Sequence, residues 1–390
     1  LKLNRRLKLL LSVERPHLPA MFSRAVFVGA CLVTGVAAAP LRSYEGYTFE
    51  QFLAEFNKSY PASELQLRRT RFQESLQKVH AHNSEYEAGR HRWYMAMNHL
   101  ADWTPEESAQ LRGTKRGRMQ GPTIELRAAG PNPETMDWRE RGSVTPVKNQ
   151  GMCGSCWAFA AVETVESHFH IASGKLLVLS PQTYVDCVEN PDECGGTGGC
   201  SGATAELAFN LTASKGVALE KDLPYEMKDE ACPQFTPAVK ADGFVRLPVN
   251  DANALETALA TKGPVAVTVA ADNWELYGGG IFDRCGRPDF SRDGAPSVTL
   301  DHGVQAVGYT KDAWIVRNSW GHAWGEHGFI LLSRATDSQT FPDLKPADGS
   351  ACKPYPEEQE VGGQCGILFD TSFPIGVSTA DDHSKDILVY

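Results

Sequence analysis

Ten cysteines in a chain of 390 residues limit most strongly how this sequence can fold. In a protein that enters the secretory pathway, such a number predicts a framework of disulfides. In a reducing compartment the same residues would indicate metal or redox sites. The choice depends on whether the chain carries an export signal.

The N-terminal region supplies such a signal. A basic Arg24 precedes an apolar stretch over residues 25–36, which ends in three alanines at 37–39. This pattern predicts a secretory signal peptide over residues 21–38, and residues 1–20 are interpreted as an upstream or non-native extension. We therefore expect passage through the secretory pathway to a lysosome, a vacuole or the extracellular space.

The sequence argues against a membrane span and against nucleic acid as a partner. The apolar stretch of the signal is too short to span a bilayer and no later stretch is longer, so we expect no membrane span. The formal net charge is −10, with a pI of about 5.6. This acidic balance argues against nucleic acid as a partner.

The character of the sequence changes along the chain. Residues 45–107 are charged and apolar at helical spacing, with one long helix expected over 63–87. Residues 108–132 are polar and contain glycines, which predicts an exposed linker. Residues 133–378 form a body that holds most of the aromatic residues and cysteines, and a tail follows over 379–390.

Within this body a helical pattern precedes several strand-like runs. A helix is expected from Cys156 until Gly174 ends it, because apolar residues recur there every three or four positions. Alternating runs predict strands over 265–269, 303–309 and 314–316. Helices first and strands later favour an α+β fold with two lobes.

The segment QGMCGSCW, from Gln150 to Trp157, carries the strongest chemical signal. Cys156 lies where the predicted helix begins, and the helix dipole favours a thiolate there. A redox pair with Cys153 would need a thioredoxin-like βαβ context, and half a zinc site would need a second close pair of cysteines. The sequence contains neither, so Cys156 is interpreted as a catalytic nucleophile.

A nucleophilic cysteine needs a base and a group that orients this base. A lone histidine is usually structural, but His302 starts a predicted strand and is followed by a stretch rich in glycine and tryptophan that contains Asn318 and Trp320. Asn318 is expected to accept the imidazole N–H and fix its tautomer. Gln150 is expected to form an oxyanion hole with the backbone N–H of Cys156.

These segments resemble the catalytic blocks of the papain family of cysteine peptidases, in its cathepsin L-like branch. His302 follows Cys156 by 146 residues (302 − 156), within the spacing of about 130–150 typical of the family. The resemblance implies a two-lobed papain-like α+β fold, with a helical lobe, a β-barrel-like lobe and an active-site cleft between them. It also implies a cysteine endopeptidase made as a zymogen, with no cofactor and no metal.

The upstream region resembles the inhibitory prodomain of this family. Residues at helical spacing match one propeptide motif, with Ser75 where Asn is usual: Glu64, Arg68, Phe72, Val79 and Asn83. A second motif is matched with Ala in place of Gly and Leu in place of Phe: Ala96, Asn98, Leu100 and Asp102. The resemblance implies that this helical prodomain lies along the cleft and is removed on activation.

Disulfides and the substrate cleft are also assigned by resemblance. The implied disulfides are Cys153–Cys200, Cys187–Cys232 and Cys285–Cys365. Cys194 and Cys352 remain, and we predict that they form a fourth disulfide because a free thiol is unfavourable in a secreted protein. The implied substrate-binding residues are Gly202, Ala203, Thr204, Ala205, Thr268, Leu300, Asp301, Gly303 and Trp320.

Asp370 aligns with the floor of the S2 pocket, which receives the P2 side chain of a substrate. A carboxylate there would bind Arg or Lys and turn away for Leu or Phe, which predicts a dual preference. The alternative is an Asp that caps a local turn.

The implied partners are protein and peptide substrates, the chain's own prodomain and cystatin-type inhibitors, with the protein itself a monomer. Two sequons predict glycans on Asn57 and Asn210. A catalytically silent binding protein and a disulfide-rich structural protein remain as alternatives, and the intact Gln, Cys, His and Asn set argues against both.

Overall fold

The computed structural model describes residues 41–113, 121–126, 130–287 and 297–382. The expected extension and signal peptide lie outside these residues. From Tyr44 onward the chain forms one compact unit, and every contact below lies within it. In the described part of the chain, no helix is both long enough and apolar enough to cross a membrane.

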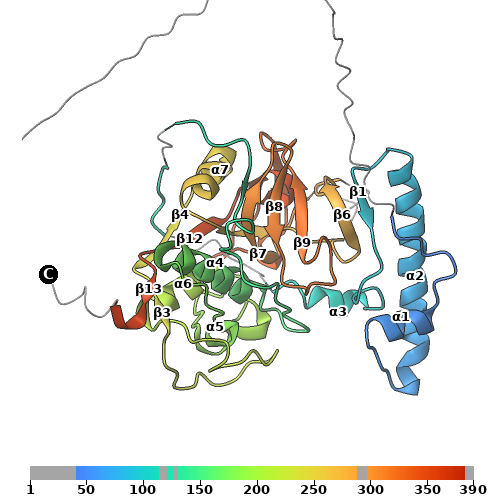
Figure 1. Ribbon diagram of the computed structural model, residues 1–390, viewed down its shortest axis with the longest axis horizontal. Helices are drawn as coiled ribbons and strands as arrows, with labels where there is room; N and C mark the ends of the chain where they lie inside the picture. The colour runs from blue at the N-terminus through green and yellow to red at the C-terminus, as the bar shows by residue number, and fades with distance from the viewer. Residues whose placement is uncertain (1–40, 114–120, 127–129, 288–296, 383–390) are drawn as a thin grey trace, which may run out of the picture. The chain divides into compact units, whose positions relative to one another are not determined.

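The prodomain contains helices α1 (Phe49–Glu55), α2 (Ala62–Glu87) and α3 (Pro105–Ala109) and the short strand β1 (Trp93–Met95) (Figure 1). The long helix expected from the sequence is therefore confirmed as α2. Capping boxes at Thr48 and Thr104 start α1 and α3. Each threonine hydroxyl accepts from the backbone N–H three residues later, and each threonine N–H donates back to the side chain of that residue. Apolar residues of α1 and α2 pack into one cluster, which gives the prodomain its own core.

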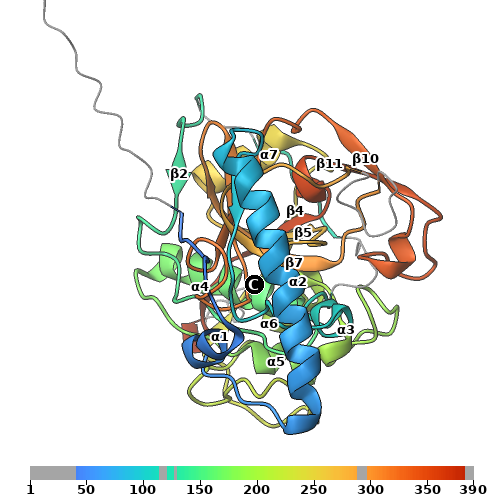
Figure 2. The same ribbon diagram turned by 90° about the vertical axis from the view of Figure 1, so that its right-hand side faces the viewer.

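Strand β1 joins the prodomain to the rest of the structure. It pairs in antiparallel fashion with β6 (Tyr277–Phe282). The side chain of Asn83 on α2 holds β1 in place, accepting from Met95 N at 2.8 Å and donating to Met95 O at 2.9 Å. Arg68 on α2 pairs with Glu107 on α3 at 2.6 Å. Figure 2 shows α2 lying along this side of the body.

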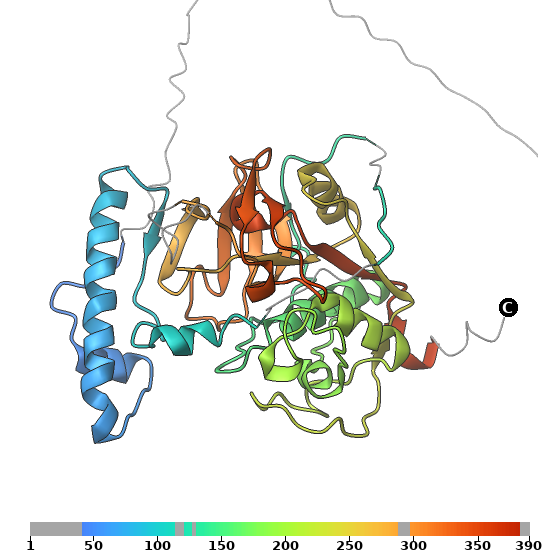
Figure 3. The ribbon, with the colours of Figure 1, turned by 180° about the vertical axis from the view of Figure 1, so that it is seen from behind.

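The helical lobe contains α4 (Cys156–Ser173), α5 (Pro181–Cys187) and α6 (Ala205–Ser214). Helix α4 ends at Gly174, whose φ of 72° is left-handed and favours glycine, as the sequence predicted. Thirteen of the 18 residues of α4 are buried, because α5, α6 and the sheet pack against this helix. Figure 3 shows these green helices beneath the sheet.

The second lobe is built on one large sheet, in the order β1-β6-β9-β8-β7-β5-β12-β4 with β2 beside β7. Its remaining members are β2 (Met136–Asp137), β4 (Gly243–Arg246), β5 (Val265–Val269), β7 (His302–Tyr309), β8 (Ala313–Arg317), β9 (Phe329–Ser333) and β12 (Thr371–Ile375). Three of them, β5, β7 and β8, confirm the predicted strands. The sheet ends at β1 and β4, so the lobe expected to be barrel-like has an unclosed sheet.

Smaller elements complete the body. Helix α7 (Ala252–Thr261) packs against β5 and β7, and β3 (Val239–Lys240) pairs with β13 (Ser378–Thr379). The long segment 336–363 contains a hairpin of β10 (Thr340–Asp343) and β11 (Gln359–Gly362). Helices and a mainly antiparallel sheet in two lobes confirm the α+β fold.

Candidate active site

Cys156 is the first residue of α4, and its side chain is fully buried. Its Sγ accepts backbone hydrogen bonds from Gly303 at 3.4 Å and from Gly113 of the prodomain at 3.3 Å. No other cysteine in the described part of the chain is free of a disulfide. The N-terminus of α4 and the two N–H groups all favour negative charge on this sulfur.

His302 is the first residue of β7 and directly precedes Gly303, whose N–H donates to the Cys156 sulfur. Its Nε2–H donates to Asn318 Oδ1 at 2.8 Å, which leaves Nδ1 for proton exchange with the thiol. The indole of Trp320 lies 5.0 Å from the imidazole between ring centroids and is fully buried. This indole shields the His302–Asn318 hydrogen bond from water.

The pKa of His302 is lowered to about 4 by burial. The hydrogen bond to Asn318 and the charge of Asp301 act in the opposite direction, whereas the positive charge of Arg112 lowers the pKa further. Arg112 belongs to the segment just after α3. A backbone hydrogen bond with Leu111 in the same segment raises the pKa, so burial remains the main cause of the lowered value.

The side-chain amide of Gln150 contacts both Ser319 and the prodomain. Its Oε1 accepts from Ser319 Oγ at 2.7 Å, so the amide is fixed with Nε2 facing the nucleophile. Nε2 donates to the carbonyl oxygen of Leu111 at 2.9 Å. A backbone carbonyl of the prodomain thus lies against the amide that the sequence predicted for an oxyanion hole.

The segment Leu111–Gly113 is buried, and the expectation of an exposed linker is wrong for these residues. A Cβ added to Gly113 would lie 1.7 Å from the carbonyl oxygen of Gly154, and one added to Gly202 would lie 1.9 Å from the Gly113 oxygen. Only glycines allow the two backbones to approach this closely. The prodomain therefore reaches into the catalytic centre itself.

Comparison with known proteins agrees with this geometry. Residues 132–343 match the model of the papain family cysteine proteases, and residues 49–108 match the cathepsin propeptide inhibitor domain. Procathepsin L of Rattus norvegicus is 36% identical over 323 residues, which cover 78% of this chain and 92% of the relative. The cathepsin L-like proteinase of Phaedon cochleariae is 34% identical, with 74% of this chain and 90% of the relative covered.

Solved structures give the same result. The digestive procathepsin L2 proteinase from the larval midgut of Tenebrio molitor aligns with a TM-score of 0.69 at 32% identity, over 84% of this chain and 98% of that structure. This chain belongs to the papain family of cysteine proteases. It is a cysteine endopeptidase in zymogen form, and its own propeptide inhibitor domain keeps it inactive until that domain is removed.

The residues expected to line the substrate cleft of the protease lie on both sides of Cys156. On the helical lobe, Gly202 follows the short turn Gly199–Ser201, and Thr204 is the N-cap of α6, with Ala203 and Ala205 flanking Thr204. On the other lobe, Thr268 of β5 pairs with Gly303 of β7. Leu300 is buried two residues before His302. These residues stay candidates for substrate contact.

Asp370 of the protease is already engaged by its own chain. Its Oδ1 lies 3.0 Å from Arg246 Nη2, and its Oδ2 accepts from Thr268 Oγ1 at 3.2 Å. Both members of the ion pair are buried. Glu206 lies in the same cluster, and burial together with the charge of Asp370 raises the pKa of Glu206 to about 7.

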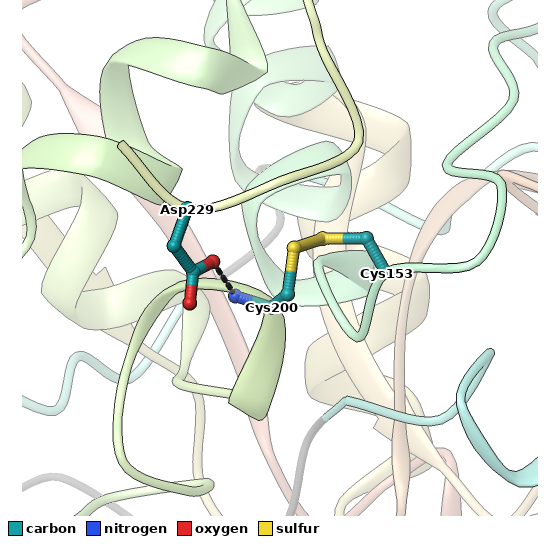
Figure 4. A group of neighbouring side chains, drawn as sticks. All are labelled: Cys153, Cys200 and Asp229. Carbon is teal, nitrogen blue, oxygen red and sulfur yellow. Dashed lines mark hydrogen bonds between the residues drawn. A yellow bond between two sulfur atoms is a disulfide. The ribbon is translucent and has the colours of Figure 1, made fainter. Parts of the chain in front are cut away.

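All four predicted disulfides are present: Cys153–Cys200, Cys187–Cys232, Cys194–Cys352 and Cys285–Cys365. Figure 4 shows Cys153–Cys200 beside Asp229, whose carboxylate accepts a hydrogen bond from the backbone N–H of Cys200. These three residues have metal-binding atoms close together. Because the two sulfurs are bonded to each other, they are not available as thiolate ligands.

Both sequon asparagines are exposed, as a glycan acceptor must be. Asn57 follows α1, and Asn210 lies on α6. Thr212 of the second sequon is buried and hydrogen bonded to the Tyr184 hydroxyl at 2.7 Å. The asparagine of this sequon faces solvent while its threonine is part of the core.

Proposed function

We propose that Cys156 attacks the carbonyl carbon of the scissile peptide bond as a thiolate paired with protonated His302. The imidazolium then gives its proton to the leaving amine, and a thioester remains on Cys156. A water molecule transfers a proton to His302 and attacks the thioester, which releases the acid product and restores the thiolate. Asn318 keeps the imidazole oriented through both steps.

Gln150 Nε2 and the backbone N–H of Cys156 form the proposed oxyanion hole. The observation that carries this proposal is the hydrogen bond of 2.9 Å between Gln150 and the Leu111 carbonyl oxygen, which stands in for the substrate oxygen. The first N–H groups of a helix have no partner within that helix and point outward. The backbone N–H of Cys156, the first residue of α4, is the proposed second donor.

We propose that the inhibitory prodomain spans residues 45–107 and continues through Gly113. Cleavage between about residues 123 and 133 then frees the peptidase domain, which runs to residue 378 ahead of a tail over 379–390. A signal peptide over 21–38 would direct the zymogen into the secretory pathway, towards a lysosome, a vacuole or the outside. Peptide substrates and the prodomain are the main partners of a monomer, and cystatin-type proteins are proposed as inhibitors.

We further propose that the S2 pocket prefers an apolar P2 side chain. The ion pair with Arg246 offsets the charge of Asp370, so this carboxylate is not available to a cation in the way that the sequence alone suggested. Comparison of matched substrates with Leu or Arg at P2 tests this assignment. A strong preference for Arg would mean that Asp370 leaves Arg246 when substrate binds.

Labelling with an epoxide thiol probe tests the proposed mechanism. The acid-matured protease should react at Cys156 and lose all activity, whereas a Cys156→Ala protein should neither react nor hydrolyse peptides. N-terminal sequencing of the matured chain locates the activation cleavage. Turnover by a clean Cys156→Ala preparation would refute the assignment of the nucleophile.

A further inference from the structure

Arg112 of the prodomain lies in a pocket of three carboxylates from the peptidase domain. Its Nε is 2.9 Å from Asp301 Oδ2, its Nη1 is 3.0 Å from Glu275 Oε1, and its Nη2 is 3.8 Å from Asp272 Oδ1. Only 3% of the arginine side chain is exposed. The pocket is therefore shaped to enclose a guanidinium group.

One guanidinium faces three carboxylates in this pocket. Removal of the prodomain takes away the guanidinium of Arg112 and leaves the three carboxylates. The carboxylates stay together, because Asp272 and Glu275 lie in one loop between β5 and β6 and the Asp301 carboxylate is fixed by the Ala271 N–H at 3.0 Å. In the mature enzyme these carboxylates would therefore form an empty site for a cation.

The pocket lies on the leaving-group side of the nucleophile. Asp301 directly precedes His302, and His302 must reach the nitrogen of the leaving amine in the proposed mechanism. After Arg112 the backbone of the prodomain leaves the pocket, because the carbonyl oxygen of Gly113 lies against Gly202. A substrate residue that follows the scissile bond, called P1′, would therefore place its side chain where that of Arg112 now lies.

We infer that the mature protease uses Asp272, Glu275 and Asp301 to recognise a basic P1′ side chain in its substrates, arginine more strongly than lysine. This inference rests on the proposed function. The planar guanidinium can bind several carboxylates at once, as Arg112 does, whereas an ammonium group acts as a point charge. Cleavage would leave a product peptide that begins with the basic residue.

Matched fluorogenic peptides that differ only at P1′, with Arg, Lys, Leu or Glu there, test this inference on the acid-matured protease. We expect kcat/KM for Arg to exceed that for Leu by about tenfold and Glu to be the poorest. Raising the ionic strength should reduce the difference between Arg and Leu, because the emptied pocket is open to solvent and its charges are screened.

The double variant Asp272→Asn, Glu275→Gln should bring the Arg to Leu ratio to within roughly threefold of one. The variant Glu140→Gln removes one negative charge at an exposed turn and should keep the wild-type ratio. If the wild-type protease cleaves both peptides equally, the inference is overturned even when no variant folds. If no peptide is cleaved and no thiol probe reacts, the proposed function itself fails.

Discussion

The backbone carbonyl oxygen of Leu111 lies 2.9 Å from the side-chain nitrogen Nε2 of Gln150. Two residues later the N–H of Gly113 donates to the Cys156 sulfur at 3.3 Å. The prodomain therefore contacts both the proposed oxyanion donor and the proposed nucleophile. Arg112 between these residues adds a positive charge that opposes protonation of His302.

A methyl group at Gly113 should break this inhibition. The Cβ of Gly113→Ala would lie 1.7 Å from the Gly154 oxygen, so the segment must leave its position. We expect the uncleaved precursor to hydrolyse a peptide substrate at neutral pH roughly tenfold faster than the wild-type precursor, since such overpacking costs about 1–3 kcal/mol. Gly130→Ala is the matched control, because nothing lies within 4 Å of its Cβ. Equal activity of the Gly113→Ala and wild-type precursors would contradict this account.

Asn318 should affect the rate without abolishing it. In Asn318→Ala the His302 ring loses the acceptor that fixes its tautomer, but the nucleophile and the base remain. We expect kcat to fall roughly ten- to hundredfold, whereas Cys156→Ala should be inactive. Single-turnover acylation and the pH profile of kcat/KM should show the altered imidazole. An Asn318→Ala enzyme as inactive as Cys156→Ala would assign Asn318 a more direct role.

The residues proposed as catalytic could be singled out from the sequence because their signals are local. Cys156 and Gln150 share one short motif, and the stretch that holds Asn318 can be recognised by its glycines and tryptophans. The strand limits of β5 were also predictable, because four of its five residues are apolar and all five are buried. These features depend on neighbours along the chain, which a sequence displays directly.

The pocket of Arg112 was missed for the opposite reason. An arginine beside a glycine in a polar segment suggests solvent exposure, and its partners Glu275 and Asp301 lie far along the chain. Strand β1 was missed because three residues carry little strand signal and its pairing with β6 depends on tertiary contact. The ion pair of Asp370 with Arg246 likewise joins distant residues. Sequence patterns indicate elements, but long-range charge pairs appear only in the folded chain.

Acid should release the prodomain partly through His99. Burial and the nearby charge of Lys58 lower the pKa of His99 to about 4 in the docked prodomain. A histidine with a depressed pKa stabilises the docked state above its ordinary pKa of 6.5, and this contribution is lost as the pH falls towards 4. His99→Gln cannot take up this proton, so the midpoint pH of maturation should move down by about half a unit.

A histidine on the surface provides the control for this experiment. His80 is exposed on α2, and His80→Gln should leave the midpoint of maturation where it is. His82 should add to the effect, because burial also lowers its pKa to about 4. If neither His82→Gln nor His99→Gln moves the midpoint, carboxylates rather than histidines govern the release.

The disulfide Cys194–Cys352 should stabilise the long segment 336–363. It joins residues 158 apart in the sequence, and next to it Lys353 N donates to Asp192 O at 3.0 Å. We expect the double variant Cys194→Ser, Cys352→Ser to lose about 2–4 kcal/mol in urea unfolding. Lys353→Ala removes only the neighbouring ion pair with Glu193 and should cost less than about 1 kcal/mol. Alkylation of both cysteines in the native protein would show that the disulfide does not form.

Glu206 should make the mature protease more stable in acid than above neutral pH. It is buried with Asp370 and Arg246, and its pKa is raised from the ordinary 4.5 to about 7. A carboxyl group that binds its proton more tightly when folded stabilises the protein fully below 4.5, and this stabilisation is lost as the pH rises through about 7. Urea unfolding of the inhibitor-blocked protease at pH 5 and pH 8 measures the difference. Glu206→Gln should reduce it by on the order of 2 kcal/mol, whereas the exposed Glu140→Gln should leave it unchanged. If the Glu206→Gln protease keeps the full wild-type difference, other groups carry the whole effect. Buried Glu163 is one such group, because burial also raises its pKa to about 7.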